Sequence, residues 1–190
     1  AQLARVIEIV RAQRRVGAER HPLNQLAPER WLRRLPTRAT FPWEPPGEPP
    51  GSAQRLVGLA APQLGIATRV ILVDTSYQGV DRDREERRLG VFINPVIVQR
   101  SAELTTGREG CYSTGNVRGL VRRAVSVTVE ALDQDGVHTV TTADGFVARV
   151  IQHEVDHLDG YRFPDRIDDD AHLHWVEPHE IATYAKAAPH

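Results

Sequence analysis

The spacing of apolar residues divides the first third of the chain into two unlike stretches. The apolar side chains of the first ten residues include Leu3, Val6, Ile7 and Val10. These positions share one side of a helix, so the pattern predicts an amphipathic helix over residues 2–16. Six prolines then crowd residues 36–51. Because proline fits neither a helix interior nor a central strand, this stretch is expected to be an extended loop.

The middle of the chain has the pattern of β-strands. Residues 69–74 and 91–99 are rich in Val and Ile and predict two strands, with the mixed-charge run 81–88 as a solvated turn between them. Apolar and polar residues alternate over 125–131, and after a polar turn the chain returns over 137–142. This pattern predicts a β-hairpin.

A helix is predicted over residues 144–159. Its side chains Phe146, Val150, Ile151 and Leu158 are expected to face the core, and Gly160 is expected to end it. Several strands around one such helix predict an α+β domain, with antiparallel or mixed β-sheets around a central helix.

Composition and charge restrict the class of protein. A chain of 190 residues with 41% hydrophobic content can bury one sizeable core. The net charge of −1 and dispersed basic residues give no reason to expect direct nucleic-acid binding. No run approaches the roughly 18 apolar residues of a membrane span, and the first residues lack the apolar core of a signal peptide. A cytoplasmic protein without membrane contact is expected.

The predicted central helix carries an H-E-x-x-H motif formed by His153, Glu154 and His157. Histidines four residues apart lie on one face of a helix, so both imidazoles can bind one metal ion, with the glutamate beside a metal-bound water. The helix is therefore expected to be metal-binding, and the motif indicates metal-assisted hydrolysis.

A catalytic metal needs a third protein ligand, and the motif leaves its identity open. Phe163 occupies the position at which metzincin proteases have a third histidine, and phenylalanine cannot bind a metal. Glu177 lies at a distance that thermolysin-like zinc endopeptidases use, but it is followed by proline in a short polar tail. The single cysteine, Cys111, is the favoured candidate, since small or polar neighbours weaken its alternative as a core thiol.

Three motifs in order resemble the signature of the peptide deformylase family. They are Leu56-Val57-Gly58-Leu59-Ala60-Ala61-Pro62-Gln63, then Glu109-Gly110-Cys111-Tyr112-Ser113, then Gln152-His153-Glu154-Val155-Asp156-His157. The resemblance covers residues 56–167. It implies one domain over 1–190, with a divergent helix and proline-rich loop over 1–55, a catalytic core over 56–167 and a tail over 168–190.

The resemblance also implies the roles of the site residues. Cys111, His153 and His157 would bind one divalent metal ion, Fe(II) in most of the family, with zinc, nickel or cobalt as other occupants. Glu154 would be the general base. The side-chain amide of Gln63 and the backbone N–H of Tyr112 would stabilise the oxyanion.

The implied reaction is hydrolysis of the N-formyl group of N-formylmethionyl peptides, releasing formate, on nascent chains that include ribosome-associated ones. A monomer is expected. The substrate-binding residues would be Val57, Gly58, Glu109, Gly110, Val147 and Val150, with His153 beside the side-chain pocket. Glu109 is also a candidate for the family's ion pair beneath the site, with Arg118 or Arg123 as its partner. Asp156 either orients a ligand imidazole or is an exposed helix residue.

Two departures from the family pattern leave the substrate open. Leu56 replaces a glycine, and Tyr112 replaces the usual leucine. Both changes allow a specialised amidase for an N-formyl or N-acyl metabolite as an alternative, and Glu177 keeps a zinc endopeptidase open as another. A silent binding module is disfavoured, because a structural metal needs no base such as Glu154.

Overall fold

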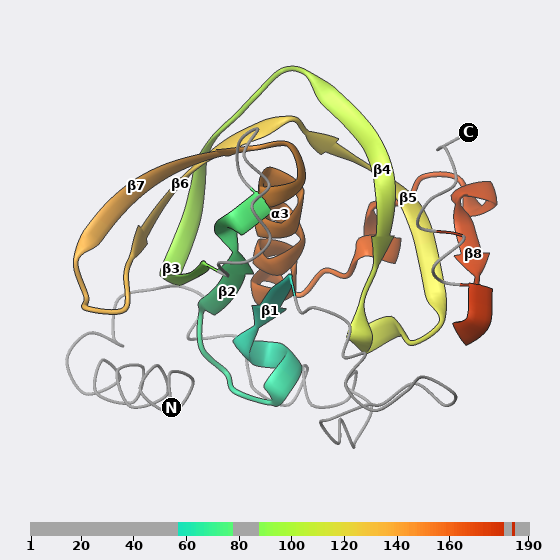
Figure 1. The fold of residues 1–190 in the computed structure, drawn as a ribbon, viewed down its shortest axis with the longest axis horizontal. Coiled ribbons are helices and arrows are strands. Elements are labelled where there is room, and N and C mark those ends of the chain that lie inside the picture. The colour runs from blue at the N-terminus through green and yellow to red at the C-terminus, as the bar shows by residue number, and fades with distance from the viewer. Residues whose placement is uncertain (1–56, 78–87, 181–183, 185–190) are drawn as a thin grey trace.

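The computed structural model describes residues 57–77, 88–180 and 184, which form two antiparallel sheets on either side of one helix (Figure 1). The predicted helix 2–16, the proline-rich loop 36–51 and most of the charged stretch 81–88 lie outside the described residues. The α+β architecture with a central helix is as predicted from the sequence.

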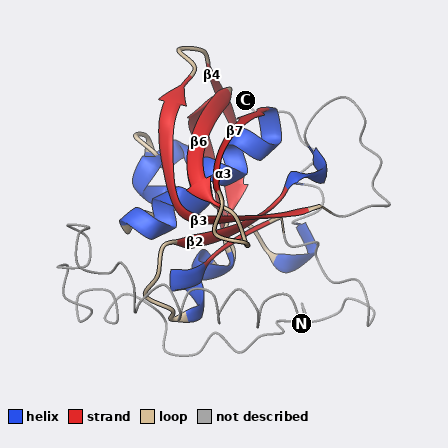
Figure 2. Cartoon of the chain, turned by 90° about the vertical axis from the view of Figure 1, so that its left-hand side faces the viewer, coloured by secondary structure: helices blue, strands red, loops and turns tan. Residues whose placement is uncertain are grey.

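The larger sheet has five strands in the order β1-β2-β3-β6-β7. They are β1 (Gly58–Ala60), β2 (Val70–Asp74), β3 (Leu89–Arg100), β6 (Ser126–Leu132) and β7 (His138–Asp144). In the side view of Figure 2, β3 lies between β2 and β6 in the sheet, and it pairs antiparallel with both. The predicted strands and the hairpin are confirmed. The hairpin turn is closed by Asp133, whose Oδ1 accepts hydrogen bonds from the N–H groups of Asp135 and Val137, both 2.9 Å long.

The central helix α3 (Gly145–Asp159) begins directly after β7 and ends at Gly160, whose φ of 86° is left-handed. The apolar side of the helix packs on the five-stranded sheet through Val147, Ile151 and Val155, which are spaced four residues apart. The expectation for Phe146 is wrong, because its side chain is 46% exposed. It lies in the first turn, on the side of the helix that carries His153 and His157 rather than on the side of Val147 and Ile151.

The second sheet has three strands in the order β4-β5-β8 and covers the opposite side of α3. They are β4 (Leu104–Gly110), β5 (Val117–Ala124) and β8 (Leu173–Trp175). Strand β8 lies in the stretch 168–190 that the sequence pattern predicts as a polar tail, and it adds an edge strand to β5. None of the helices in the described residues combines the length and apolar character needed to cross a bilayer.

Candidate metal centre and active site

The second sheet and the central helix bring three potential metal ligands together. Cys111 follows the last residue of β4, while His153 and His157 lie one turn apart on α3. One donor atom from each lies within 4.8 Å of the others, and all three residues are buried. The Cys111 Sγ atom is 3.2 Å from Nε2 of His157. A thiolate with two imidazoles is a donor set that suits several divalent transition metals.

The other candidate for the third ligand lies elsewhere. Glu177 is exposed, and its Oε1 accepts a hydrogen bond of 2.9 Å from Nε1 of Trp175. Glu177 is not part of the group that could hold a metal ion in the described residues. Of the two candidates left open by the sequence, only Cys111 is placed next to the histidines.

The environment of Cys111 favours the thiolate. Burial raises the pKa of the thiol, but hydrogen bonds with His153 and His157 outweigh it and lower the pKa to about 5. The backbone N–H of Ser113 and the side-chain amide of Gln63 also point at Sγ, at 3.4 and 3.3 Å.

Gln63 is fixed in the short helix η2 (Ala61–Leu64), which follows β1 directly. Its Oε1 accepts a hydrogen bond of 2.8 Å from the N–H of Ala60. This contact sets the orientation of the amide, so the Nε2 donor faces Cys111 and Ser113. A donor held beside the ligand sulfur could stabilise negative charge that develops on a substrate oxygen.

Glu154 lies between the two histidines along α3 and is only 4% exposed. Its Oε2 atom is buried without a hydrogen-bond partner in the described residues. Burial raises the pKa of Glu154 to about 7, although His153 and His157 lower it in part. A buried polar atom without a partner is costly unless a bound group uses it. The unpaired carboxylate oxygen and the donor set both fit a metal ion with a bound water.

Glu109 supports His153 from the side of β4. Its Oε2 lies 2.9 Å from Nδ1 of His153, which leaves the other ring nitrogen for a metal. Arg123 donates two hydrogen bonds of 2.9 Å to the same carboxylate. Burial raises the pKa of Glu109, but the hydrogen bonds from Arg123 and His153 outweigh it and lower the pKa to about 2.

The structure shows which arginine pairs with Glu109 and which groups pair with Asp156. Arg118 does not reach Glu109, and it donates to the backbone carbonyls of Gly115 and Val117 instead. Asp156 is neither exposed nor hydrogen-bonded to an imidazole. It is buried and forms ion pairs with Arg123 and Arg166. Both expectations for Asp156 are therefore wrong, because Arg123 and Arg166 cover this side of the helix and bind both oxygens of the carboxylate.

The residues expected to bind substrate take different places. Gly58 in β1 lies against Val150 and Glu154, close enough that a Cβ at this position would overlap both side chains. Val57 is half-buried just before β1, whereas Val147 is fully buried in the core of the five-stranded sheet. Tyr112, next to Cys111, is 44% exposed.

Gly110, the last residue of β4, lies against the side chain of Arg118, and an added Cβ would come 2.5 Å from its Cδ atom. Phe163 is buried, and its ring stacks on that of His153 with centroids 6.2 Å apart.

Arg149 is a residue of this site to which the sequence assigned no role. It is buried, and its guanidinium donates a hydrogen bond to the carboxylate of Glu109. Its charge in a helix would have suggested a solvent-facing residue.

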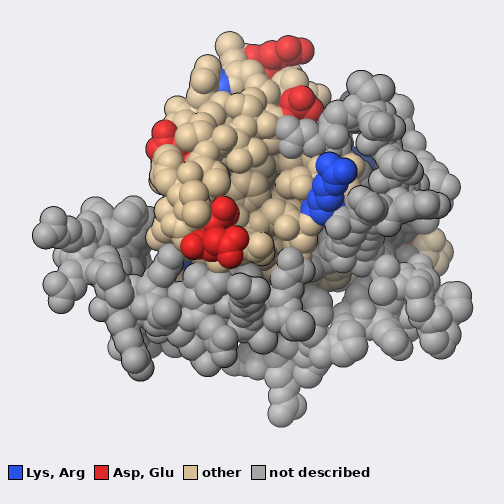
Figure 3. Space-filling view, turned by 60° about the vertical axis from the view of Figure 1, so that its left-hand side comes forward, with Lys and Arg blue, Asp and Glu red and all other residues tan. Residues whose placement is uncertain are grey.

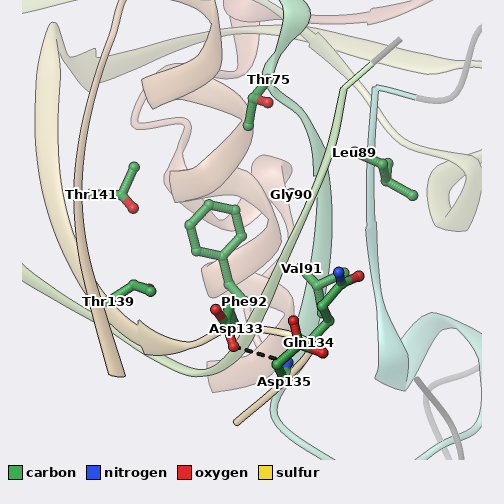
Figure 4. A pocket seen from close by; sticks show the side chains of 10 residues that line it. All are labelled: Thr75, Leu89, Gly90, Val91, Phe92, Asp133, Gln134, Asp135, Thr139 and Thr141. Atoms are coloured by element: carbon green, nitrogen blue, oxygen red, sulfur yellow. Dashed lines mark hydrogen bonds between the residues drawn. The ribbon is translucent and has the colours of Figure 1, made fainter. Parts of the chain in front are cut away.

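A pocket lies away from the metal centre. It has a volume of about 440 Å³, and residues 75, 89–92, 133–135, 139 and 141 line it. Figure 4 shows Phe92 between Thr75 and Thr139. At one end of the pocket, the N–H of Asp135 donates a hydrogen bond to Oδ1 of Asp133. On the face drawn in Figure 3, the described charged side chains stand apart rather than forming a patch of one sign. Neither feature adds chemistry to the site.

Cys111 after β4 and the two histidines of α3 form a group that can hold a metal ion, and the buried Oε2 atom of Glu154 beside them has no hydrogen-bond partner in the described residues. Ligands with a neighbouring base are the arrangement of a metal-dependent hydrolase. Residues 52–172 match the family model described as polypeptide deformylase. The chain belongs to the peptide deformylase family.

Relatives and solved structures agree with this assignment. Peptide deformylase from Thermomicrobium roseum is 43% identical over 136 residues, 72% of this chain and 76% of that protein. The enzyme from Treponema pallidum is 45% identical over 113 residues, 60% of this chain and 64% of that protein. The solved structure of a class I type b peptide deformylase from Acinetobacter baumannii, bound to Met-Ala-Ser, is 43% identical. It has a TM-score of 0.52 and covers 58% of this chain and 70% of that one. A peptide deformylase from Synechococcus elongatus in complex with actinonin is 38% identical, with a TM-score of 0.54 and 60% coverage of both chains.

Proposed function

We propose that this protein hydrolyses the N-formyl group of N-formylmethionyl peptides and releases formate. One observation carries the proposal: a buried carboxylate oxygen of Glu154, without a hydrogen-bond partner in the described residues, belongs to a residue beside three potential metal ligands. A structural metal site needs ligands but no base, so this arrangement supports hydrolysis. Membership of the peptide deformylase family indicates that the group removed from the substrate is a formyl group.

Cys111, His153 and His157 would hold one divalent ion. That ion would lower the pKa of a bound water and polarise the formyl oxygen. The hydrogen bond from His153 to Glu109 keeps the imidazole in the orientation for binding.

Glu154 would accept the proton of the attacking water and then deliver it to the departing amine. Burial, which raises the pKa of Glu154, supports both steps, because a base works best when its pKa lies near the working pH. The Gln63 amide and the backbone N–H of Tyr112 would donate hydrogen bonds to the developing oxyanion. The position of Gln63 next to Sγ of Cys111 supports this role.

We propose that Val57, Gly58, Gly110 and Val150 border the bound peptide, since Gly58 lies against Val150 and Glu154 and Gly110 directly precedes the ligand Cys111. Glu109, whose carboxylate already has three side-chain partners, would act through His153 rather than on the peptide. Val147 would support Val150 from within the core.

Family membership supports the remaining parts of the proposal. The native ion would be Fe(II), with zinc, nickel or cobalt as other occupants, because the donor set itself accepts all four. The substrates would be nascent chains in the cytoplasm, including ribosome-associated ones, and the protein would act as a monomer of one domain.

The test is formate release from formyl-Met-Ala-Ser by protein purified without oxygen and loaded with Fe(II). Formyl-Ala-Ala-Ser and a small N-formyl amine, each at the same concentration, serve as comparison substrates. The proposal predicts the fastest release from the formylmethionyl peptide. Faster release from the small formamide would contradict it and indicate an amidase for a metabolite, with the exposed Tyr112 as the first residue to change.

A further inference from the structure

The central helix α3 has a second buried face, and that face is polar. Arg149, Gln152, His153 and Asp156 are spaced so that they lie on one side of the helix, and all four are buried. Gln152 hydrogen-bonds both backbone groups of Ala124, at 3.2 and 3.0 Å. The helix therefore packs on the five-stranded sheet through apolar side chains and on the three-stranded sheet through hydrogen bonds and ion pairs.

This polar face joins the two parts of the structure that supply the metal ligands. Cys111 comes from the end of β4 in the three-stranded sheet, whereas His153 and His157 come from α3. The distances between the donor atoms depend on how the helix sits against β4. Contacts between α3 and β4 should therefore influence metal affinity as well as stability.

Arg149 makes most of these contacts with one guanidinium group. Its Nη1 donates to Oε1 of Glu109 and to the carbonyl of Val121, both at 2.8 Å. Its Nη2 donates to the carbonyl of Thr105, also at 2.8 Å. The side chain thus binds β4, β5 and the carboxylate that orients His153.

Gly107 makes room for this arrangement. A Cβ atom at position 107 would lie 2.9 Å from Cζ of Arg149 and 3.0 Å from its Nε and Nη2 atoms. Real Cβ contacts are essentially never shorter than 3.0 Å, so a side chain at position 107 would push the guanidinium away from its present place against β4. Gly107 is four residues before Cys111 on the same segment.

We propose that Arg149, resting on Gly107, is a positioning residue that sets the place of Cys111 relative to His153 and His157 and thereby the affinity for the metal. The proposal rests on the metal centre of the proposed function, but it does not depend on the substrate. Partners that orient metal ligands typically change affinity or activity by about 10–100-fold when they are removed.

Arg69 provides a matched control. It also donates to the backbone and to the end of α3, with hydrogen bonds of 3.3 Å to the carbonyl of Leu158 and 2.7 Å to Oδ1 of Asp159. It ties the helix to the five-stranded sheet, and it has no contact with the Glu109 network. Loss of Arg69 should lower stability without changing the geometry of the metal ligands.

The experiment compares the dissociation constant for Co(II), measured by competition with a chelator, in R149M, R149K and R69M proteins. The intensity of the thiolate-to-cobalt absorption and the unfolding of the metal-free protein are recorded alongside. R149M should bind Co(II) about 10–100-fold more weakly, with an altered thiolate absorption. R149K should show a smaller loss, because lysine can reach one acceptor but not three, and R69M should keep wild-type affinity.

Gly107 supplies a second, independent arm. G107A should weaken Co(II) binding in the wild-type background, and the same change should have little further effect in R149M, because the atoms it displaces belong to Arg149. If R149M does not fold, R149K and G107A decide the question. Wild-type affinity in R149M or R149K would overturn the positioning role and leave the proposed function intact. A wild-type protein that binds no Co(II) would overturn both.

Discussion

Replacing Gly58 with alanine should damage catalysis through Glu154 while leaving the metal ligands in place. The added Cβ would lie 2.6 Å from Cγ1 of Val150 and 3.0 Å from the carboxyl carbon of Glu154, and it would overlap Oε1 of the same group. None of these atoms belongs to Cys111, His153 or His157. The perturbation therefore acts on the base and on the substrate side of the site.

The size of the effect follows from these contacts. Carbon atoms in contact are ordinarily about 3.5–4.0 Å apart. The strand or the two side chains must therefore move by about 1 Å. Overpacking of this kind costs about 1–3 kcal/mol of the free energy of unfolding. A misplacement of about 1 Å near reacting atoms can lower the rate about 100-fold. We expect a loss of that order in kcat.

Gly90 in β3 separates the two effects. A Cβ there would lie 2.9 Å from Cε2 of Phe92 and 3.1 Å from Cγ2 of Thr75, a milder crowding remote from the metal ligands. G90A should therefore lose some stability in urea unfolding but keep its kcat for formyl-Met-Ala-Ser. Equal kcat values for G58A and the wild type, at equal metal content, would refute the assigned position of Glu154.

Two further predictions concern the ligands and the charges behind them. C111A should lose its metal on dialysis, whereas E177A should retain it, as measured by metal analysis. The reverse pattern would contradict the assignment and favour a zinc endopeptidase with Glu177 as the third ligand. R123M leaves Glu109 and Asp156 with one fewer cation in a buried network. Its free energy of unfolding in urea, measured without metal, should fall by about 3–5 kcal/mol. A change within about 0.5 kcal/mol, as is usual for surface residues, would contradict this.

Features fixed by spacing along the chain could be predicted from the sequence. The four-residue separation of His153 and His157 specifies one face of a helix, and the alternation over 125–131 specifies one face of a strand, observed at 126–132. Gly160 ends the helix as expected, because a glycine adopts the left-handed conformation there readily. These features depend on local geometry alone.

Features that depend on what packs against a segment could not be predicted in this way. The polar face of α3 has the pattern of a solvent-exposed face, so Arg149 and Asp156 gave no sign of their burial. The element that covers them lies at residues 104–124, and its position is set by tertiary packing.

The partner of Glu109 illustrates the same limit. The register of β4 and β5 places Glu109 opposite Gly119 and Gly110 opposite Arg118. Since successive side chains of a strand face opposite sides, Arg123 shares the face of Glu109 and Arg118 does not. The choice between the two arginines follows from the register, which the sequence pattern did not specify.

The most direct test of the central claim compares the wild-type protein with E154Q in formate release from formyl-Met-Ala-Ser. Both proteins are loaded with Fe(II) without oxygen and brought to equal metal content. If Glu154 is the base, E154Q should bind metal normally and react about 10²–10⁴-fold more slowly. An E154Q protein that releases formate at the wild-type rate would contradict the account.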